Sequence, residues 1–244
     1  MDKLRIVSAT RKEPRAFTET ALLGHSIKML SWNQRMIVNV TCNNDRGLPN
    51  IYNRAIRESG DDEALLLVHD DVLIQDYYLY TRVREGLETF DVVGVAGNVS
   101  PEAGQPTWTH VRGPDGSLKL CERGVLSGIV GHLIGGKKGL AFYGPVPRQC
   151  GLLDGCFLAV RAKVLREKRI FFDEQFRFHF YDLDFCRSCT ASGLRLGTWP
   201  VAIYHGSRGN FETPEWKAGW ELYRRKWGDA ALPAAGEPDK NSPD

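Results

Sequence analysis

Along the first 97 residues, short apolar runs alternate with amphipathic segments. The apolar runs have the length of strands and lie at residues 4–9, 36–41, 64–69 and 92–97. The amphipathic segments have the spacing of helices and lie at residues 18–31, 49–58 and 76–90. Continuously apolar strands are typical of a sheet that helices cover on both faces. The alternation therefore predicts an α/β fold in which βαβ units build a mainly parallel sheet.

The alternation stops at about residue 98. Residues 98–148 are rich in glycine and proline and contain GPDGS, GGKKG and YGPVP, which are typical of turns. We therefore expect an insertion that runs as a long excursion over the surface. Such segments are usually lids or binding loops, and a mobile surface insertion without a function is the alternative.

Strand and helix patterns return after the insertion. They predict a strand at residues 155–162, a short helix around Val164, a helix at 180–192 and extended chain at 194–205. A last helix begins at Thr213 and Pro214. Its aromatic residues recur at spacings of three and four and are expected to pack in the core: Trp216, Trp220, Tyr223 and Trp227. We expect one domain over residues 1–227 and a disordered tail over residues 228–244.

Composition narrows the classes of function. The 244 residues include 32 lysines and arginines against 30 aspartates and glutamates, which gives a net charge of +2. This balance argues against a protein that holds nucleic acid or anionic lipid through bulk electrostatics. No apolar run approaches the ~20 residues of a membrane span, and the first twenty residues lack the apolar core of a signal peptide. We therefore expect no transmembrane segment and a cytoplasmic location.

The most informative motif follows a predicted strand. The apolar run ALLLV leads directly into His69, Asp70 and Asp71. In open parallel sheets, ligands bind outside the carboxyl ends of the strands, so two adjacent carboxylates there are placed to meet a ligand. A carboxylate at a sheet end is costly unless it is solvated, paired or bound to a metal. The alternative is that both aspartates cap the following loop.

Two further groups of candidate residues lie in the second half of the chain. Asp182 and Asp184 stand near the start of a predicted helix, where the helix dipole favours carboxylates. Either could act as a general base toward a substrate hydroxyl, and a structural role is the alternative. His205 ends an extended run. A lone histidine is more often structural, but with carboxylates nearby it would suit a divalent ion.

Several well-known motifs are absent from the sequence. It contains no GxGxxG after the first strand, no GxxxxGK[ST] and no HExxH, which removes the usual support for dinucleotide binding, P-loop phosphate binding and zincin hydrolysis. The six cysteines include one CxxC, Cys186 and Cys189, but no paired arrangement that would indicate a zinc knuckle. The GGKKG segment could touch phosphate or form a solvated turn.

Taken in order, the motifs resemble those of GT-A fold glycosyltransferases of the family 2 type. The shared order is a βαβ half, a strand ending in an acidic motif, Asp154 and Gly155 before a short strand, a YDxD helix, and a strand ending in histidine. The resemblance runs from about residue 4 to residue 227, and it is closer to a glycosyltransferase-like group that has HxD in place of DxD. It implies a Rossmann-like GT-A fold, with a mixed, mainly parallel sheet flanked by helices.

The resemblance also implies a metal site. Asp71 matches the acid that binds a divalent ion, Mn²⁺ or Mg²⁺, which holds the donor diphosphate. His205 matches a late metal ligand of the family. His69 stands where the family has the first aspartate of DxD, and it completes the set of candidate metal ligands.

Roles in catalysis and donor binding follow from the same resemblance. Asp182 matches the catalytic base of inverting transfer, although Tyr181 stands where the family has glutamate, and Asp184 would orient the site. Asp154 and Gly155 would face the donor sugar and the acceptor. The residues that would approach the nucleotide are Ser8, Thr10, Asn43, Asn44, Asn53 and Asp70.

The implied function is a metal-dependent inverting glycosyltransferase. It would transfer a sugar from a nucleotide-diphosphate donor, with UDP preferred, to a hydroxyl of a glycan or another acceptor. Two alternatives stay open. One is a non-catalytic module that binds nucleotide sugar or glycan on the same fold. The other is a metallohydrolase that uses His69, Asp70, Asp71 and His205.

Overall fold

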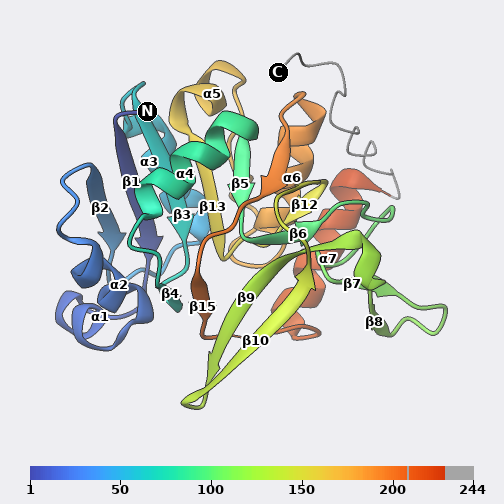
Figure 1. Cartoon of the computed structure of the whole chain (residues 1–244). Coiled ribbons are helices and arrows are strands. Elements are labelled where there is room, and N and C mark those ends of the chain that lie inside the picture. The colour runs from blue at the N-terminus through green and yellow to red at the C-terminus, as the bar shows by residue number, and fades with distance from the viewer. Residues whose placement is uncertain (208, 229–244) are drawn as a thin grey trace.

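The larger sheet of the protein is mixed and has seven strands. In the computed structural model, which describes residues 1–207 and 209–228, these strands are β1 (Lys3–Ala9), β2 (Met36–Thr41), β3 (Glu63–Val68), β5 (Val92–Gly94), β11 (Arg148–Cys150), β13 (Phe157–Arg161) and β14 (Leu196–Thr198). Their order across the sheet is β11-β14-β5-β13-β3-β1-β2 (Figure 1). Five of them run in one direction, and β13 and β11 run against the others. The predicted mainly parallel sheet is thus confirmed.

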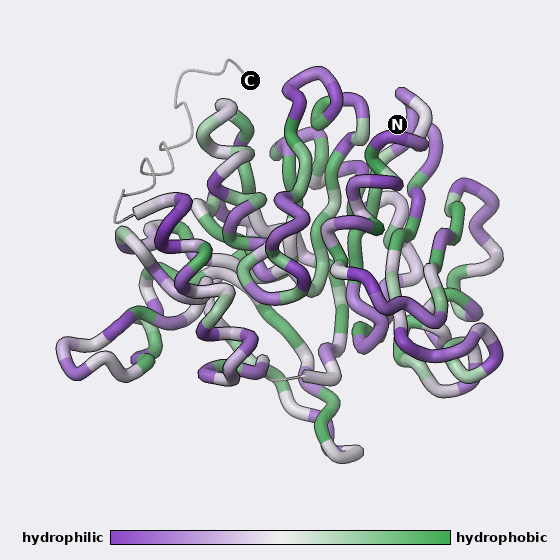
Figure 2. Tube along the Cα trace, turned by 180° about the vertical axis from the view of Figure 1, so that it is seen from behind, coloured by the Kyte–Doolittle hydropathy of each residue, from purple (hydrophilic) through white to green (hydrophobic). Residues whose placement is uncertain are grey.

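Apolar side chains explain why β3 lies at the centre of this sheet. Residues 64–68 are fully buried, and β3 pairs with β1 on one side and β13 on the other. Figure 2 shows that apolar residues concentrate along the strands, whereas polar residues lie on the surrounding segments. Because β3 is held on both sides, the residues that follow it start from a rigid position.

Helices flank the sheets, as the sequence predicts. They are α1 (Pro14–Thr20), α2 (Leu22–Leu30), α3 (Leu48–Glu58), α4 (Leu79–Thr89), α5 (Ala162–Glu167), α6 (Tyr181–Ala191) and α7 (Pro214–Trp227). The single helix expected at residues 18–31 is wrong: Ala21 has extended backbone, with φ −81° and ψ 141°, and separates α1 from α2. This break lets the Leu23 amide donate to the Asp70 carbonyl at 3.1 Å. The start of α2 is thereby joined to the loop after β3.

The last helix agrees with its sequence signals. The Thr213 hydroxyl accepts a 3.2 Å hydrogen bond from the Trp216 amide and caps α7. Trp216, Trp220 and Tyr223 are buried and pack against Phe180, which confirms them as core packing, and Trp227 is partly buried against the same core. The tail predicted to be disordered lies outside the described residues from residue 229 on.

A second, smaller sheet lies beside the first. Five of its six strands are β4 (Val72–Ile74), β6 (Ala96–Asn98), β9 (Leu126–Ile134), β12 (Leu152–Leu153) and β15 (Ile203–His205), in the order β12-β6-β9-β15-β4, and the sixth, β10 (Lys137–Gly144), pairs with β9. The strand expected at residues 92–97 is divided, because the chain leaves the large sheet after Gly94 and joins the small sheet at Ala96. Likewise, the extended chain expected at residues 194–205 forms β14 in one sheet and β15 in the other.

Most of the small sheet's length comes from the insertion. Residues 98–148 contain β7 (His110–Arg112), β8 (Leu118–Leu120), the 3-10 helix η1 (Arg123–Val125), β9 and the paired strand β10 (Lys137–Gly144). The expectation of turns alone is therefore wrong. Gly135 and Gly136 have φ of 57° and 76° and join β9 to β10 as a two-residue turn. The GGKKG segment thus forms the tip of a hairpin that projects from the body (Figure 1).

Among the helices of residues 1–207 and 209–228, none combines the length and the apolar character that a membrane crossing would need.

Candidate active site

A cavity of about 330 Å³ lies at the carboxyl ends of β1 and β3. Its wall includes Ala9 at the end of β1 and the residues that follow β3, as expected for a ligand site of an open α/β sheet. Six polar residues singled out from the sequence belong to this wall: His69, Asp70, Asp71, Asp154, Asp182 and His205. Residues far apart in the sequence are thereby brought into one concave site.

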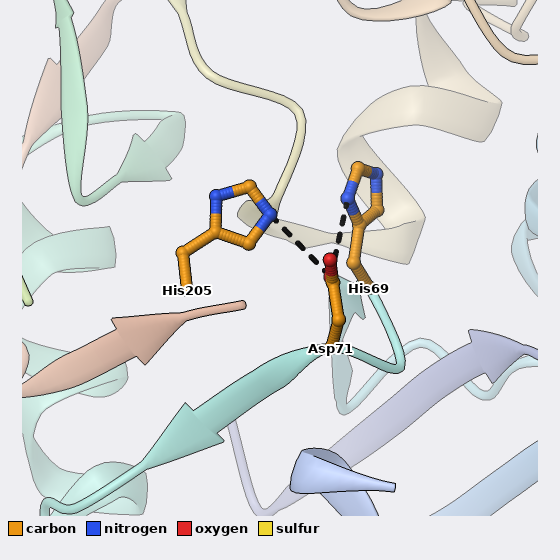
Figure 3. A group of neighbouring side chains, drawn as sticks. All are labelled: His69, Asp71 and His205. Carbon is orange, nitrogen blue, oxygen red and sulfur yellow. Dashed lines mark ion pairs between the residues drawn. The ribbon is translucent and has the colours of Figure 1, made fainter. Parts of the chain in front are cut away.

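Three of these residues direct ligand atoms toward one another. His69 follows β3, Asp71 precedes β4, and His205 ends β15 (Figure 3). Asp71 Oδ1 lies 3.4 Å from His205 Nε2 and 4.0 Å from His69 Nδ1. One ligand atom from each residue lies within 4.8 Å of those of the other two. The sequence-based set of candidate metal ligands is therefore assembled in space.

Backbone pairing explains how His205 reaches this position. β15 runs antiparallel to β4 with His205 opposite Val72, and the Gly206 amide donates to the Asp71 carbonyl at 2.8 Å. β15 also pairs with β9 on its other side, where His205 is opposite His132. The histidine is thus held beside Asp71 by strands on both sides.

The electrostatics of the three residues fit a divalent cation. Asp71 Oδ1 and His205 Nε2 are buried, and neither has a hydrogen-bond partner among the described residues. Burial raises the pKa of Asp71, but His205 and His69 outweigh it and hold this pKa below its ordinary value. Burial lowers the pKa of His69, and Asp71 opposes this only in part. An ionised carboxylate, the unpartnered Nε2 of His205 and Nδ1 of His69 form a donor set suited to a first-row divalent ion.

The pKa of His205 is shifted in the opposite direction to that of His69. Burial lowers the pKa of His205, but the neighbouring Asp71 carboxylate raises it further, so that it lies above its ordinary value. When the imidazole of His205 is protonated, it forms an ion pair with the Asp71 carboxylate, 3.4 Å away. A bound cation would take the place of the imidazole proton, because metal ligation needs the deprotonated imidazole.

A second group of possible ligands shares His205. It consists of Asp154, Cys156 and His205. Both carboxylate oxygens of Asp154 already accept hydrogen bonds, from Trp108 Nε1 at 2.9 Å and from the Cys156 amide at 2.8 Å. Burial raises the pKa of the Cys156 thiol well above its ordinary value, and a thiol is a poor ligand until it is deprotonated. The site of His69, Asp71 and His205 is therefore the better cation site.

Asp182 lies in the first turn of α6 and faces the cavity. Its Oδ2 accepts a 3.0 Å hydrogen bond from the Gly155 amide. Burial, followed by the nearby Asp154 carboxylate, raises the pKa of Asp182 to about 7. A carboxylate with a pKa near neutral is well suited to accept a proton from a hydroxyl at physiological pH.

Position 155 has no room for a side chain, because the loop after β12 lies directly against Tyr181 and Asp182. A Cβ atom added there would lie 2.4 Å from Tyr181 Oη and 2.7 Å from Asp182 Cβ. The Gly155 carbonyl also accepts a 2.9 Å hydrogen bond from the Tyr181 hydroxyl. Only glycine allows the loop after β12 to approach α6 this closely.

Asp184 is not part of the cavity. The side chain is buried on the other side of α6, where Oδ1 accepts hydrogen bonds from Trp227 Nε1 and Lys226 Nζ, each at 2.8 Å. Residues two apart on a helix point about 200° away from one another, so Asp182 and Asp184 cannot face the same ligand. The structure brings Asp182 to the site and directs Asp184 toward α7.

The six candidate nucleotide-binding residues separate into two groups. One is a connected group of Asp70, Thr10, Asn43 and Asn44, and the other is the pair of buried residues Ser8 and Asn53. Asp70 lines the cavity, and its Oδ2 accepts a 2.6 Å hydrogen bond from Thr10 Oγ1. The loop after β2 joins them, because the Asn44 amide donates to the Thr10 carbonyl and the Asn43 amide donates to the Lys12 carbonyl. Ser8 and Asn53 are buried outside the cavity wall.

Asn53 has its side-chain amide fully engaged. Its Nδ2 donates to the Phe172 carbonyl and to Glu174 Oε1, each at 2.9 Å, and its Oδ1 accepts from the Phe172 amide at 2.8 Å. These bonds fasten α3 to the segment that precedes α6. The structure does not bring Asn53 to the other candidate residues.

Sequence reasoning missed the contribution of the insertion to the site. Trp108 and Tyr143 line the cavity, with ring centroids 4.8 Å apart in an edge-to-face arrangement. Thr107, Thr109 and His110 form hydrogen bonds around Trp108 and also line the cavity. The signal in the sequence was the segment TWTH, because an aromatic residue among hydroxyls is unusual in a stretch of turns.

The comparison with known proteins identifies the fold. No protein-family model and no curated protein sequence matches the chain. Among solved structures, A197 from STIV is similar with a TM-score of 0.50 and 12% identity, over 84% of this chain and 86% of that chain. This likeness and the topology described above confirm a mixed α/β fold with sheets flanked by helices.

Two glycosyltransferases are also among the similar structures. GalNAc-T7, solved with UDP, GalNAc and Mn²⁺, has a TM-score of 0.46 and 12% identity over 84% of this chain. TarS residues 1–349 from S. aureus has a TM-score of 0.46 and 11% identity over 84% of this chain. The matched region spans 44% of the GalNAc-T7 chain and 60% of the TarS chain.

Proposed function

We propose that this protein is a metal-dependent inverting glycosyltransferase with a GT-A fold. It would transfer a sugar from a nucleotide-diphosphate donor, a UDP-sugar, to a hydroxyl of a glycan or another acceptor. The observation that carries the proposal is one cavity that contains both the three converging ligand atoms and the Asp182 carboxylate. We further propose that residues 1–227 form one domain, in which the insertion at residues 98–148 supplies a wall of the cavity.

His69, Asp71 and His205 would hold the divalent ion. When bound, the ion would supply positive charge that stabilises the leaving diphosphate. Mg²⁺ prefers oxygen ligands, whereas imidazole nitrogens suit transition metals, so two histidines favour Mn²⁺ over Mg²⁺. This preference supports a manganese site.

Asp182 would be the general base. The acceptor hydroxyl would bind beside its carboxylate, and its proton would pass to Asp182 as the hydroxyl oxygen attacks the anomeric carbon from the face opposite the nucleotide. The Gly155 amide holds Oδ2 in place, and the raised pKa keeps the carboxylate basic enough to accept the proton near pH 7. Inversion follows from attack on the opposite face.

The donor would lie between the metal ligands and the carboxyl end of β1. Asp70, held by Thr10, would contact the ribose or the sugar, and the loop of Asn43 and Asn44 would approach the nucleotide. Ser8, buried within β1, would support this end of the strand without contacting the donor. Asp154 and Gly155 would face the transferred sugar. Trp108 would then keep Asp154 in position through its indole N–H. Asp184 would orient the site indirectly, by fixing α6 against α7.

One observation favours a second function, a metallohydrolase. Two histidines and one carboxylate are also a common ligand set of catalytic zinc, with a position left open for water. Tight binding of Zn²⁺ without any nucleotide would favour this alternative. A non-catalytic module would bind UDP with metal and show no turnover.

Calorimetry with UDP in the presence and absence of Mn²⁺ tests the proposal, followed by transfer assays with a panel of nucleotide sugars. We expect UDP binding that depends on Mn²⁺ in the wild type and is lost in Asp71→Asn. Asp115→Asn, which changes an exposed aspartate outside the cavity, is the control. UDP binding that is equally tight with and without Mn²⁺, and unchanged by Asp71→Asn, would contradict the metal-dependent mechanism.

A further inference from the structure

The hydroxyl of Tyr181 connects two parts of the proposed site. Tyr181 is the first residue of α6 and is buried with 2% of its surface exposed. Its Oη lies 2.7 Å from His69 Nε2 and 2.9 Å from the Gly155 carbonyl oxygen. The hydroxyl therefore stands between a candidate metal ligand and the loop that holds Asp182.

The direction of these two hydrogen bonds follows from the chemistry of the groups. A hydroxyl has one proton to donate, and a carbonyl oxygen can only accept. If both bonds form, Tyr181 donates to Gly155 and must accept from His69. His69 Nε2 then carries the proton.

The other nitrogen of His69 is consequently left to face the metal site. Its nearest carboxylate oxygen, Asp71 Oδ1, is 4.0 Å away, which is too long for a hydrogen bond that would hold a proton on Nδ1. The lone pair of Nδ1 therefore points toward Asp71 and His205 before any cation is bound (Figure 3). This is the tautomer that metal ligation through Nδ1 requires.

We propose that Tyr181 is a positioning residue, which sets the tautomer and orientation of His69 for metal binding and joins the metal ligand to the base through Gly155. The inference rests on the proposed metal site and extends it. Gly155 receives the hydroxyl proton at its carbonyl and donates its own amide to Asp182 Oδ2 at 3.0 Å. One chain of hydrogen bonds thus runs from His69 through Tyr181 and Gly155 to Asp182.

Packing alone does not require a hydroxyl at this position. The ring of Tyr181 lies 6.0 Å from the rings of both Tyr52 and Phe172, and a phenylalanine would keep both contacts. The hydroxyl is what distinguishes tyrosine here, and both of its partners belong to the site. Partners of this kind commonly set the tautomer of a metal-ligating histidine.

The first test reads the tautomer directly in metal-free protein. Proton–nitrogen NMR correlations of the histidine rings should show His69 protonated at Nε2 in the wild type. In Tyr181→Phe, the Nε2 tautomer should lose its preference and the signals should shift toward a mixture. The control is Tyr80→Phe, because Tyr80 is also buried and its hydroxyl also donates to a backbone carbonyl, that of Met1 at 2.8 Å. A wild-type His69 protonated at Nδ1 would overturn the inference without any variant.

The second test measures Mn²⁺ affinity by calorimetry. Loss of such a partner typically lowers metal affinity about ten- to a hundredfold, so we expect this loss in Tyr181→Phe and none in Tyr80→Phe. Equal affinity in Tyr181→Phe and the wild type would overturn the positioning role. If the wild type binds no divalent ion, the proposed function fails, whereas the tautomer measurement still decides whether Tyr181 sets the protonation of His69.

Discussion

Asp184 Oδ1 and Lys226 Nζ lie 2.8 Å apart, with the carboxylate almost fully buried between α6 and α7. The same oxygen accepts the indole N–H of Trp227, also at 2.8 Å. Asp182, two residues earlier, faces the cavity and accepts the Gly155 amide. The two aspartates of the YDLD segment are therefore separated by the helix itself, one toward the site and one toward the protein's own C-terminal helix.

This separation predicts different effects for two conservative variants. Asp182→Asn should lower sugar transfer about a hundredfold to ten-thousandfold, because asparagine cannot accept the acceptor's proton, while Mn²⁺ and donor affinity stay close to the wild type. Asp184→Asn should instead lower the free energy of unfolding by about 1–3 kcal/mol, because the buried side chain loses its charge-assisted contact with Lys226, which keeps Asp173 at 2.8 Å as its other partner. Turnover and chemical denaturation of both variants check this. Normal turnover in Asp182→Asn together with a stable, donor-binding but inactive Asp184→Asn would reverse the two roles.

The second prediction concerns the adjacent carboxylates after β3. Asp71→Asn should abolish measurable Mn²⁺ binding, because Asp71 provides the only negatively charged ligand atom of the three-residue site among the described residues. Asp70→Asn should leave Mn²⁺ affinity nearly unchanged and weaken UDP binding, because Asp70 is held by Thr10 outside that site. Calorimetric titrations of both variants with Mn²⁺, then with UDP, distinguish them. Equal loss of Mn²⁺ affinity in both variants would contradict the assignment.

The pH dependence of transfer is the third prediction. The pKa of Asp182 is raised to about 7 by burial and then by Asp154, and a general base must be deprotonated to act. The rate should therefore rise with pH and level off above about pH 7. Single-turnover rates between about pH 5 and pH 9 would show the inflection. A rate that is flat across pH 7 would exclude Asp182 as the titrating base.

The same raised pKa predicts how the free energy of unfolding depends on pH. The dependence is opposite in sign to that of most carboxylates, whose pKa is lowered by folding. In the unfolded chain an aspartate loses its proton near pH 4, whereas the folded protein keeps the proton on Asp182 up to about pH 7. The free energy of unfolding therefore falls, through this group, as pH rises from about 4 to 7. Asp182→Asn removes this contribution. Its stability relative to the wild type should increase over that range, as measured by urea denaturation at several pH values.

The fifth prediction concerns the insertion wall. Amides at residues 107–110, which line the cavity, should exchange more slowly when a UDP-sugar and Mn²⁺ are bound. Amides of β9 that pair with β6, β10 and β15 should exchange slowly whether or not ligand is present. Hydrogen exchange followed by mass spectrometry resolves both segments. Unchanged exchange at residues 107–110 at saturating ligand would show that this wall does not contact the donor.

Periodic and capped elements of the fold could be predicted from the sequence. The strand before His69 is continuously apolar, and α7 begins at a Thr-Pro pair and buries its aromatic stripe. The break at Ala21 could not be foreseen, because it accompanies a hydrogen bond between Leu23 and Asp70, which are 47 positions apart in the sequence. The β9–β10 hairpin could have been predicted, since two apolar runs flank Gly135 and Gly136 in the manner of a two-residue turn.

The candidate site was predictable where its residues end or follow strands, and at Asp182, which stands in the YDxD helix. His69, Asp71 and His205 follow or end strands, and sheet topology brings such positions together. Tyr181 is hydrogen-bonded to His69, 112 positions away, and Trp108 to Asp154, 46 positions away. No local sequence pattern predicts such long-range contacts. Asn53 has a side chain that could bind a nucleotide, but its amide forms hydrogen bonds with Phe172 and Glu174, which are 119 and 121 positions away.

The pairing of β15 with β9 has a consequence for anyone who would engineer this protein. β15 carries His205 and has two neighbours in its sheet: β4 and β9. Because β9 belongs to the insertion, a shortened variant without residues 98–148 would leave His205 on a strand with a single partner. The insertion is therefore not a detachable module. Swapping it for the corresponding segment of another protein would put the proposed metal site at risk, unless the graft preserves β9.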